Sequence, residues 1–236
     1  MSKISLLIIS ILLLPLTVFA AEGVSPEGNA LWLLVMIEKG GPVMYPILLC
    51  SLVGMTLMLE RLFVLREKKI ISAEHIDEIR RYWMRNDIEQ AIERCNALNL
   101  PLYRIIKAGL IHCRHGIYEI ERAIEAAGQH ESSLLSNNLR MLGALANLTP
   151  MLGLLGTVLG MIKAFEVISI SGTGNPGLVA SGISEALITT AAGLIIGIPI
   201  LLSYHYFKGK VDSFVFEMEE VSLNLIEELI HKKNMI

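Results

Sequence analysis

The chain has 236 residues, of which 53% are hydrophobic and 18% are charged, and its mean hydropathy is +0.56. This composition excludes an ordinary soluble domain and favours a membrane protein. The 20 basic and 23 acidic residues nearly balance, and no basic patch indicates nucleic-acid binding.

The first apolar run covers residues 4–19, follows Lys3 and leads into small residues at positions 18 and 20. Residues 1–20 are therefore predicted to be a secretory signal peptide, with an uncleaved membrane anchor as the alternative. We interpret residues 21–39 as an external lead and a short interfacial helix around Trp32, because this apolar piece is too short to cross a bilayer.

Three longer apolar runs predict transmembrane helices, because a bilayer core about 30 Å thick needs roughly 20 residues of helix. We expect these helices at residues 40–60, 141–168 and 178–205, with a short periplasmic turn at residues 169–177. Prolines lie inside or beside the runs, which membrane helices tolerate when neighbouring groups satisfy the freed carbonyls.

The basic residues that flank these runs predict how the chain crosses the membrane. On one side they are Arg61, Arg66, Lys68, Lys69, Arg140, Lys208 and Lys210. On the other side Lys39 stands alone. The positive-inside rule then places the mature N-terminus outside and the C-terminus in the cytoplasm. All three cysteines lie in a span or on the reducing side, so we expect no disulfide.

Residues 61–140 are predicted to be a cytoplasmic helical segment. Asp87 and Gln90 have the spacing of a capping box, and Pro101 suits the first turn of a helix that ends before Gly116.

From Ile117 the helical pattern continues to the second apolar run, and Gly128 is the one breaker on the way. We therefore expect one helix to extend from the cytoplasm into the membrane. This helix would make the second span much longer than the bilayer requires.

The cytoplasmic tail, residues 206–236, carries apolar residues at three- and four-residue steps. They are Val211, Phe214, Val215, Met218, Val221, Leu225 and Leu229. Such a stripe must be covered by another helix, either of the same subunit or of a neighbouring one. The fold expected is an all-α integral membrane protein with three spans, long helices extending into the cytoplasm and an oligomeric helical bundle.

Two stretches carry residue types found at chemical sites, but their context argues against chemistry. The sequence "GTGNPG" (172–177) matches a dinucleotide-binding pattern without the preceding strand that the pattern needs. Cys95 and the sequence "HCRH" (112–115) do not make a closed set of four metal ligands. No catalytic residue, metal site or cofactor is expected.

Glu185 interrupts the third apolar run. An ionised carboxylate is costly in hydrocarbon, so this residue is a candidate for taking up and releasing a proton. The alternative is a neutral carboxyl group that is hydrogen-bonded to a neighbouring helix for structure. Lys163 and Glu166, at the outer end of the second run, are expected to pair or to line a vestibule, or else to form an exposed interfacial pair.

Threonines accompany this acid. Thr189 lies about 40° from Glu185 around an ideal helix and Thr190 about 140° away, so helix geometry favours Thr189. Thr157 in the second run stands among glycines with the spacing that permits close helix packing. These hydroxyls could line a polar path past Glu185, or each could bond a carbonyl of its own helix.

Three motifs carry a resemblance to a known family. They are "LERLFVLR", "TPMLGLLGTVLGMIKAF" and "GISEALITTAAGLIIGIPILL", in this order along the chain. Together they resemble the MotA/TolQ/ExbB proton channel family, and most closely its ExbB and TolQ branch. The resemblance covers residues 28–236, including the order of the spans and both cytoplasmic segments. The flagellar MotA branch resembles the chain less, because its members have four spans.

The resemblance implies a homopentamer of three-span subunits around a single-span ExbD- or TolR-like partner. It implies a proton-motive-force-driven motor subunit, not an enzyme, that energises TonB-dependent outer-membrane transport through a TonB-like protein. The implied location is the bacterial inner membrane, with a periplasmic mature N-terminus. The alternatives are a TolQ-like subunit for envelope maintenance and a passive membrane scaffold for the partner.

The resemblance also implies which residues face the pore. The family's positions fall on Glu185, Thr157 and Thr190, with protons as the coupling ion. Because helix geometry favours Thr189, we take Thr190 as the first candidate in the third span and keep Thr189 as the second.

Overall fold

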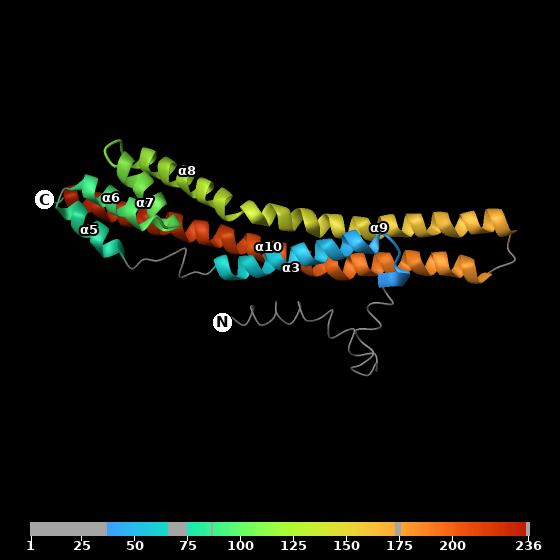
Figure 1. The fold of residues 1–236 in the computed structure, drawn as a ribbon. Coiled ribbons are helices and arrows are strands. Elements are labelled where there is room, and N and C mark those ends of the chain that lie inside the picture. Colours follow the sequence, from blue (N-terminus) through green and yellow to red (C-terminus); the bar gives the residue numbers. More distant parts are fainter. Residues whose placement is uncertain (1–36, 66–74, 86, 173–175, 235–236) are drawn as a thin grey trace. The chain divides into compact units, whose positions relative to one another are not determined.

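The computed structural model describes residues 37–65, 75–85, 87–172 and 176–234 (Figure 1). Within these ranges the chain forms helices and no strand. The helices of ten or more residues are α3 (Met44–Val64), α6 (Ile88–Leu98), α7 (Pro101–His112), α8 (Ile117–Leu135), α9 (Asn137–Ser171) and α10 (Pro176–Asn234), and the shorter α5 spans Ile76–Met84. The all-α fold predicted from the sequence is therefore confirmed.

Two compact units make up the chain. The span unit consists of Met1–Leu59 and Arg140–His205, and the bundle unit consists of Glu60–Leu139 and Tyr206–Ile236. The predicted signal peptide, residues 1–20, most of the predicted external lead at residues 21–39, and the centre of the turn at residues 169–177 lie outside the described residues.

In the described part of the chain, three helices are long and apolar enough to cross a membrane, and they are α3, α9 and α10. The first of them begins at Met44 and not near residue 40 as expected. Gly41 has a φ of +66°, which suits glycine in a turn, and its carbonyl accepts a hydrogen bond from the Met44 amide at 3.1 Å. The glycine turn therefore delays the start of the helix.

Helices α9 and α10 pack closely in the span unit because glycines face each other there. A side chain added at Gly193 would lie 2.9 Å from the Cα of Gly153. A side chain added at Gly160 would lie 2.8 Å from the Cβ of Ala186. The absence of side chains lets the two backbones approach, as the glycine spacing in the sequence predicted.

In the bundle unit, local sequence signals set the helix ends. The side chain of Asp87 accepts a hydrogen bond from the Gln90 amide at 3.2 Å and so caps α6. Helix α7 begins at Pro101, and Gly116, with a φ of +96°, precedes α8. These three predictions are confirmed.

The apolar stripe of the tail is covered within the chain itself. Val211, Phe214, Met218 and Leu225 are buried in the bundle unit. Farther along α10, the Ile226 side chain fills the space next to Gly109 of α7. Of the two alternatives for covering the stripe, the intramolecular one is correct for these residues.

The single long helix expected from Ile117 into the second span is wrong, because the chain breaks at Ser136 between α8 and α9. Gly128, the suspected breaker, lies inside α8, and the Glu219 carboxylate occupies the space where its side chain would stand. Helix α10, in contrast, is continuous from Pro176 to Asn234 in spite of Pro199.

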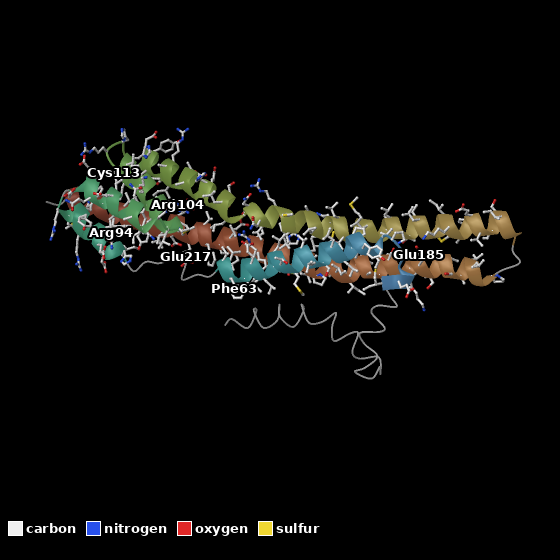
Figure 2. All side chains as sticks on the ribbon, viewed as in Figure 1. Phe63, Arg94, Arg104, Cys113, Glu185 and Glu217 are labelled. Carbon is white, nitrogen blue, oxygen red and sulfur yellow. The ribbon has the colours of Figure 1, made fainter. Side chains whose placement is uncertain are left out.

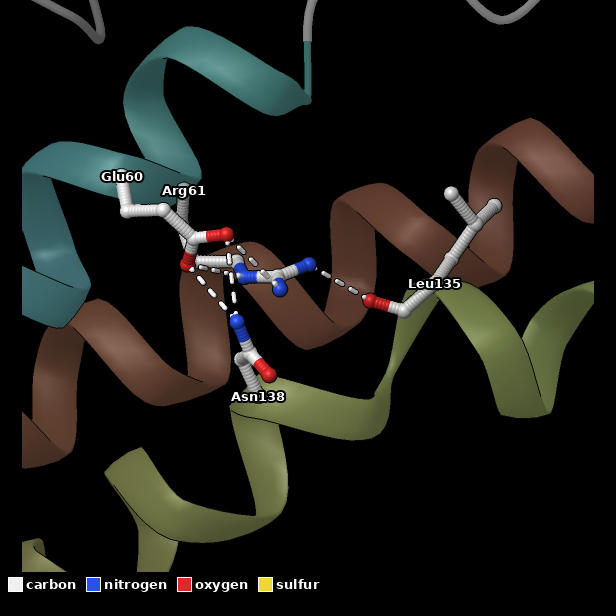
Figure 3. Close-up of polar contacts among 4 residues, drawn as sticks. All are labelled: Glu60, Arg61, Leu135 and Asn138. Atoms are coloured by element: carbon white, nitrogen blue, oxygen red, sulfur yellow. Dashed lines mark hydrogen bonds and ion pairs between the residues drawn. The ribbon is translucent and has the colours of Figure 1, made fainter.

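Four polar groups meet at the α8–α9 break (Figure 3). The buried Arg61 donates a hydrogen bond from Nη1 to the Leu135 carbonyl at 2.8 Å and a second from Nε to the Glu60 carboxylate at 3.1 Å. Asn138 donates to both oxygens of the same carboxylate, at 3.1 Å each. Arg61 thus satisfies a carbonyl at the end of α8 that has no partner further along its own helix.

Candidate proton-pathway site

The predicted site residues lie on α9 and α10 of the span unit. Glu185 is about 14 Å from the start of α10, and Lys163 is about 12 Å before the end of α9, at roughly 1.5 Å per residue. Because a short connection joins these helices and they run in opposite directions, the two side chains come to a similar level.

Thr157 of α9 and Thr190 of α10 are brought together. Their hydroxyl groups are hydrogen-bonded to each other. Thr190 also donates to the Gly153 carbonyl at 2.9 Å, and the Thr157 hydroxyl lies 3.4 Å from the Ala186 carbonyl. The two hydroxyls therefore form a polar bridge between α9 and α10, and Thr190 lies five residues beyond Glu185 along α10.

Thr189 has a different environment. It is buried, and its hydroxyl donates to the Ala186 carbonyl of its own helix at 2.9 Å. A side chain added at Gly156 of α9 would collide with it, so Thr189 occupies the space that this glycine leaves. In this chain Thr189 serves helix packing, which is the structural role that a membrane threonine commonly takes.

The Glu185 side chain is 20% exposed. Its Oε1 accepts a hydrogen bond from Lys163 Nζ at 2.5 Å. On the other side it fills the space next to Gly41, where any Cβ atom would collide with the carboxylate. Glu185, labelled in Figure 2, is therefore held between α9 and the turn that precedes α3.

The expected pair between Lys163 and Glu166 is not the one that forms. Lys163 binds Glu185, 22 residues further along the chain, and Glu166 is exposed. The sequence suggested a partner on the same helix because residues three apart can meet there. The actual partner depends on the register between α9 and α10, which residue spacing does not reveal.

Glu185 and the threonine bridge are separate in this chain. Among the described residues, the carboxylate is hydrogen-bonded to Lys163 and to neither Thr157 nor Thr190. The site residues thus share one helix pair but form two polar groups. A proton path that uses both groups requires Glu185 to change its partner, or requires water between them.

The cysteines and histidines that the sequence offered as metal ligands do not form a metal site in the described residues. In that part of the chain, no three His, Cys, Asp or Glu side chains gather as metal ligands. Cys95 is buried, and burial raises the pKa of its thiol to about 11, which keeps it protonated and unreactive at neutral pH. None of the three cysteines forms a disulfide.

Comparison with known proteins gives consistent similarities. Residues 97–220 match the model of the MotA/TolQ/ExbB proton channel family. A biopolymer transport protein of Synechocystis sp., named ExbB-like 3, is 31% identical over 174 residues, which cover 72% of this chain and 82% of that protein. The biopolymer transport protein exbB1 of Vibrio cholerae is 31% identical over 198 residues, which cover 80% and 84% of the two chains. The Tol-Pal system protein TolQ of Haemophilus influenzae is 34% identical over 115 residues, covering 48% and 49%.

Proposed function

Because the chain belongs to the MotA/TolQ/ExbB proton channel family, we propose that it is a proton-motive-force-driven motor subunit that energises TonB-dependent outer-membrane transport. It is a multi-pass membrane protein, and the described part of the chain contains three helices long and apolar enough to span a membrane. In this proposal it is not an enzyme: it converts proton movement into mechanical work. Its partners are further copies of itself in a pentamer, a single-span ExbD- or TolR-like protein and a TonB-like protein.

The observation that carries the proposal is the position of Glu185. This acid lies among apolar residues of a spanning helix, is 20% exposed, and has hydroxyl groups bridging the same two helices nearby. Acids at membrane depth are costly and mark proton or ion pathways. A carboxylate kept only for structure needs no free surface, whereas part of this one is left uncovered by its own chain.

The residues have distinct roles in the proposal. Glu185 takes up and releases the proton, and Thr157 and Thr190 line the path with hydroxyls that can both donate and accept hydrogen bonds. Thr189, which the sequence left as a second candidate, supports the path indirectly by packing α10 against Gly156.

The energy available per proton determines how many protons the motor needs for one movement. One elementary charge crossing 100 mV releases about 2.3 kcal/mol. Moving a plug or a partner protein at the outer membrane therefore requires several protons or repeated strokes. A ring of identical subunits, each with its own acid, suits repeated strokes.

The test is the variant Glu185→Gln, which keeps the size of the side chain and removes its titration. We expect the complex to assemble at normal levels while energised uptake is lost, measured as transport of a TonB-dependent cargo by whole cells. Glu166→Gln is the matched control, because it removes an exposed carboxylate from the neighbouring helix, and it should leave uptake unchanged. Normal uptake in Glu185→Gln would show that proton coupling does not pass through this residue.

A TolQ-like role in envelope maintenance is the second candidate, and the similarity to TolQ of Haemophilus influenzae favours it. Complementation separates the two roles. Expression of this chain with its own partner should restore uptake in cells that lack a TonB-energising subunit, and should not restore detergent resistance in cells that lack TolQ. The opposite result would assign the chain to the Tol system.

A passive scaffold for the single-span partner is the remaining alternative. In that role Glu185→Gln would lower the yield of the complex, and uptake would fall in proportion to yield. Measuring the amount of purified complex beside the uptake rate distinguishes the two cases.

A further inference from the structure

We propose that Lys163 is a positioning residue that latches the ionised Glu185 carboxylate and must release it before that carboxylate can take up a proton. This inference rests on the proposed function of Glu185. It assigns a role to Lys163, which is not one of the pore-facing residues implied by the family resemblance.

The first argument is the contact itself. Lys163 Nζ donates to Glu185 Oε1 at 2.5 Å, which joins α9 to α10 by an ion pair. Charge-assisted hydrogen bonds are the stronger kind, and this one lies in a segment with little competing charge. The ion pair therefore holds the carboxylate against α9.

The second argument is that the carboxylate is held from two sides. Gly41, with a φ of +66°, lies against the Glu185 carboxylate, and any larger residue there would collide with it. The same glycine turn starts α3. The latch thus involves the beginning of the first span as well as both helices of the α9–α10 pair.

Among the charged residues near the Glu185 carboxylate, Lys163 is its main partner. From α9 the charged residues at this end are Lys163 and Glu166, and Glu166 is exposed. From the segment before α3 they are Glu38 and Lys39, both exposed and of opposite sign. Lys163 is the one of these four that makes an ion pair with Glu185 in the described structure.

The third argument is that the latch can open. The Lys163 side chain is 48% exposed and the Glu185 side chain 20%, so the rest of the chain leaves the lysine room to move away on its four-carbon stem. When a proton adds to the carboxylate oxygen, the carboxyl group becomes neutral and the ion pair is lost. The lysine keeps its own proton and positive charge, and Glu185 becomes free to turn towards another partner.

The test follows the protonation of Glu185 directly. Membrane vesicles from cells that make the full chain with its native partners are treated with dicyclohexylcarbodiimide, which modifies protonated carboxyl groups. Modification of Glu185 is then measured by mass spectrometry over a range of pH. We expect Glu185 to be modified several-fold faster across this range in Lys163→Met, because the lysine no longer holds the carboxylate against α9.

Two further variants make the result specific. Lys163→Arg keeps the charge and should give the profile of the natural protein. Lys39→Met removes a positive charge from the same end of the spans without touching the ion pair, and it should change the profile much less. If Lys163→Met does not accumulate in the membrane, Lys163→Gln takes its place.

The proposed role of Lys163 is contradicted if modification of Glu185 in Lys163→Met follows the same pH profile as in the natural protein. It is also contradicted if Lys39→Met changes that profile equally. Modification of Glu185 does not require transport, so such a result would leave the proposed function intact. Normal uptake by Glu185→Gln would instead overturn the proposed function, whatever the labelling shows.

Discussion

Two acids of the bundle unit, one buried and one half-buried, show how the surroundings of a carboxylate decide its effect on stability. Glu131 of α8 is 2% exposed and is paired with Arg104 of α7 through two hydrogen bonds of 2.6 Å each. The same pair raises the pKa of Arg104. Glu219 of α10 is half-buried beside Gly128, and another acid, Glu125, acts on it. Burial, and secondly that acid, raise the pKa of Glu219.

Because the pKa of Glu219 is raised, we expect Glu219→Gln to increase the free energy of unfolding by an amount that depends on pH. The folded state favours the protonated carboxyl, so ionisation at neutral pH lowers stability, and glutamine removes that loss. We expect the variant to melt a few degrees higher at pH 7.5. Solvent screening keeps the corresponding gain in the free energy of unfolding below about 1 kcal/mol. The gain should shrink as the pH falls through the folded pKa, and it should vanish below the ordinary value of 4.5.

Thermal unfolding in detergent at several pH values measures this effect. Glu220→Gln is the matched control, because Glu220 is the exposed neighbour of Glu219 on the same helix. A gain of equal size in both variants, or a gain that persists at low pH, would contradict the role of burial.

At the scale of helices, the α8–α9 break depends on a residue far away in the chain. Arg61 lies 74 positions from Leu135, whose carbonyl it satisfies. Arg61→Met keeps a long side chain but removes the donors, and it leaves this carbonyl and the Glu60 carboxylate with one partner fewer. Hydrogen bonds to charged groups contribute about 2 kcal/mol, so we expect a stability loss of that order.

Hydrogen exchange followed by mass spectrometry checks the Arg61 prediction. Exchange at the amides of residues 132–140 should speed up in Arg61→Met and stay unchanged in Arg114→Met, which removes an exposed arginine from the loop between α7 and α8. Unchanged exchange at the break in Arg61→Met would show that Arg61 does not hold it.

Helix ends divide into those that the sequence predicts and those that it does not. Asp87, Pro101 and Gly116 mark helix ends because their effect on the backbone is local. The break at Ser136 has no such signal, since the helical pattern continues on both sides of it. The long-range hydrogen bond from Arg61 helps to stabilise it.

At the scale of the whole molecule, the distribution of basic residues predicts the orientation in the membrane. Ile170 near the end of α9 and Phe216 in the tail are both strongly exposed, at 77% and 69%. In a chain whose native cysteines are replaced, Ile170→Cys should react with a membrane-impermeant maleimide on intact spheroplasts. Phe216→Cys should react only after the membrane is permeabilised. The reverse pattern would overturn the predicted orientation.

The sequence by itself determined the class of the protein and predicted three membrane-crossing helices, which the described part of the chain contains. It also supplied the residues on which the proposed function depends. Composition and the length of apolar runs are properties of the chain alone, because the cost of placing polar groups in lipid acts on each segment separately. The short motifs around Thr157 and Glu185 were sufficient to indicate the family, which the comparisons then showed.

Only the tertiary structure decided which side chains meet. Thr190, and not Thr189, bonds Thr157, and Lys163 binds Glu185 in place of Glu166. Both outcomes follow from the register in which α9 lies against α10, and glycine contacts such as Gly153 with Gly193 set that register. A register is a relation between two helices, so the periodicity of either helix alone does not contain it.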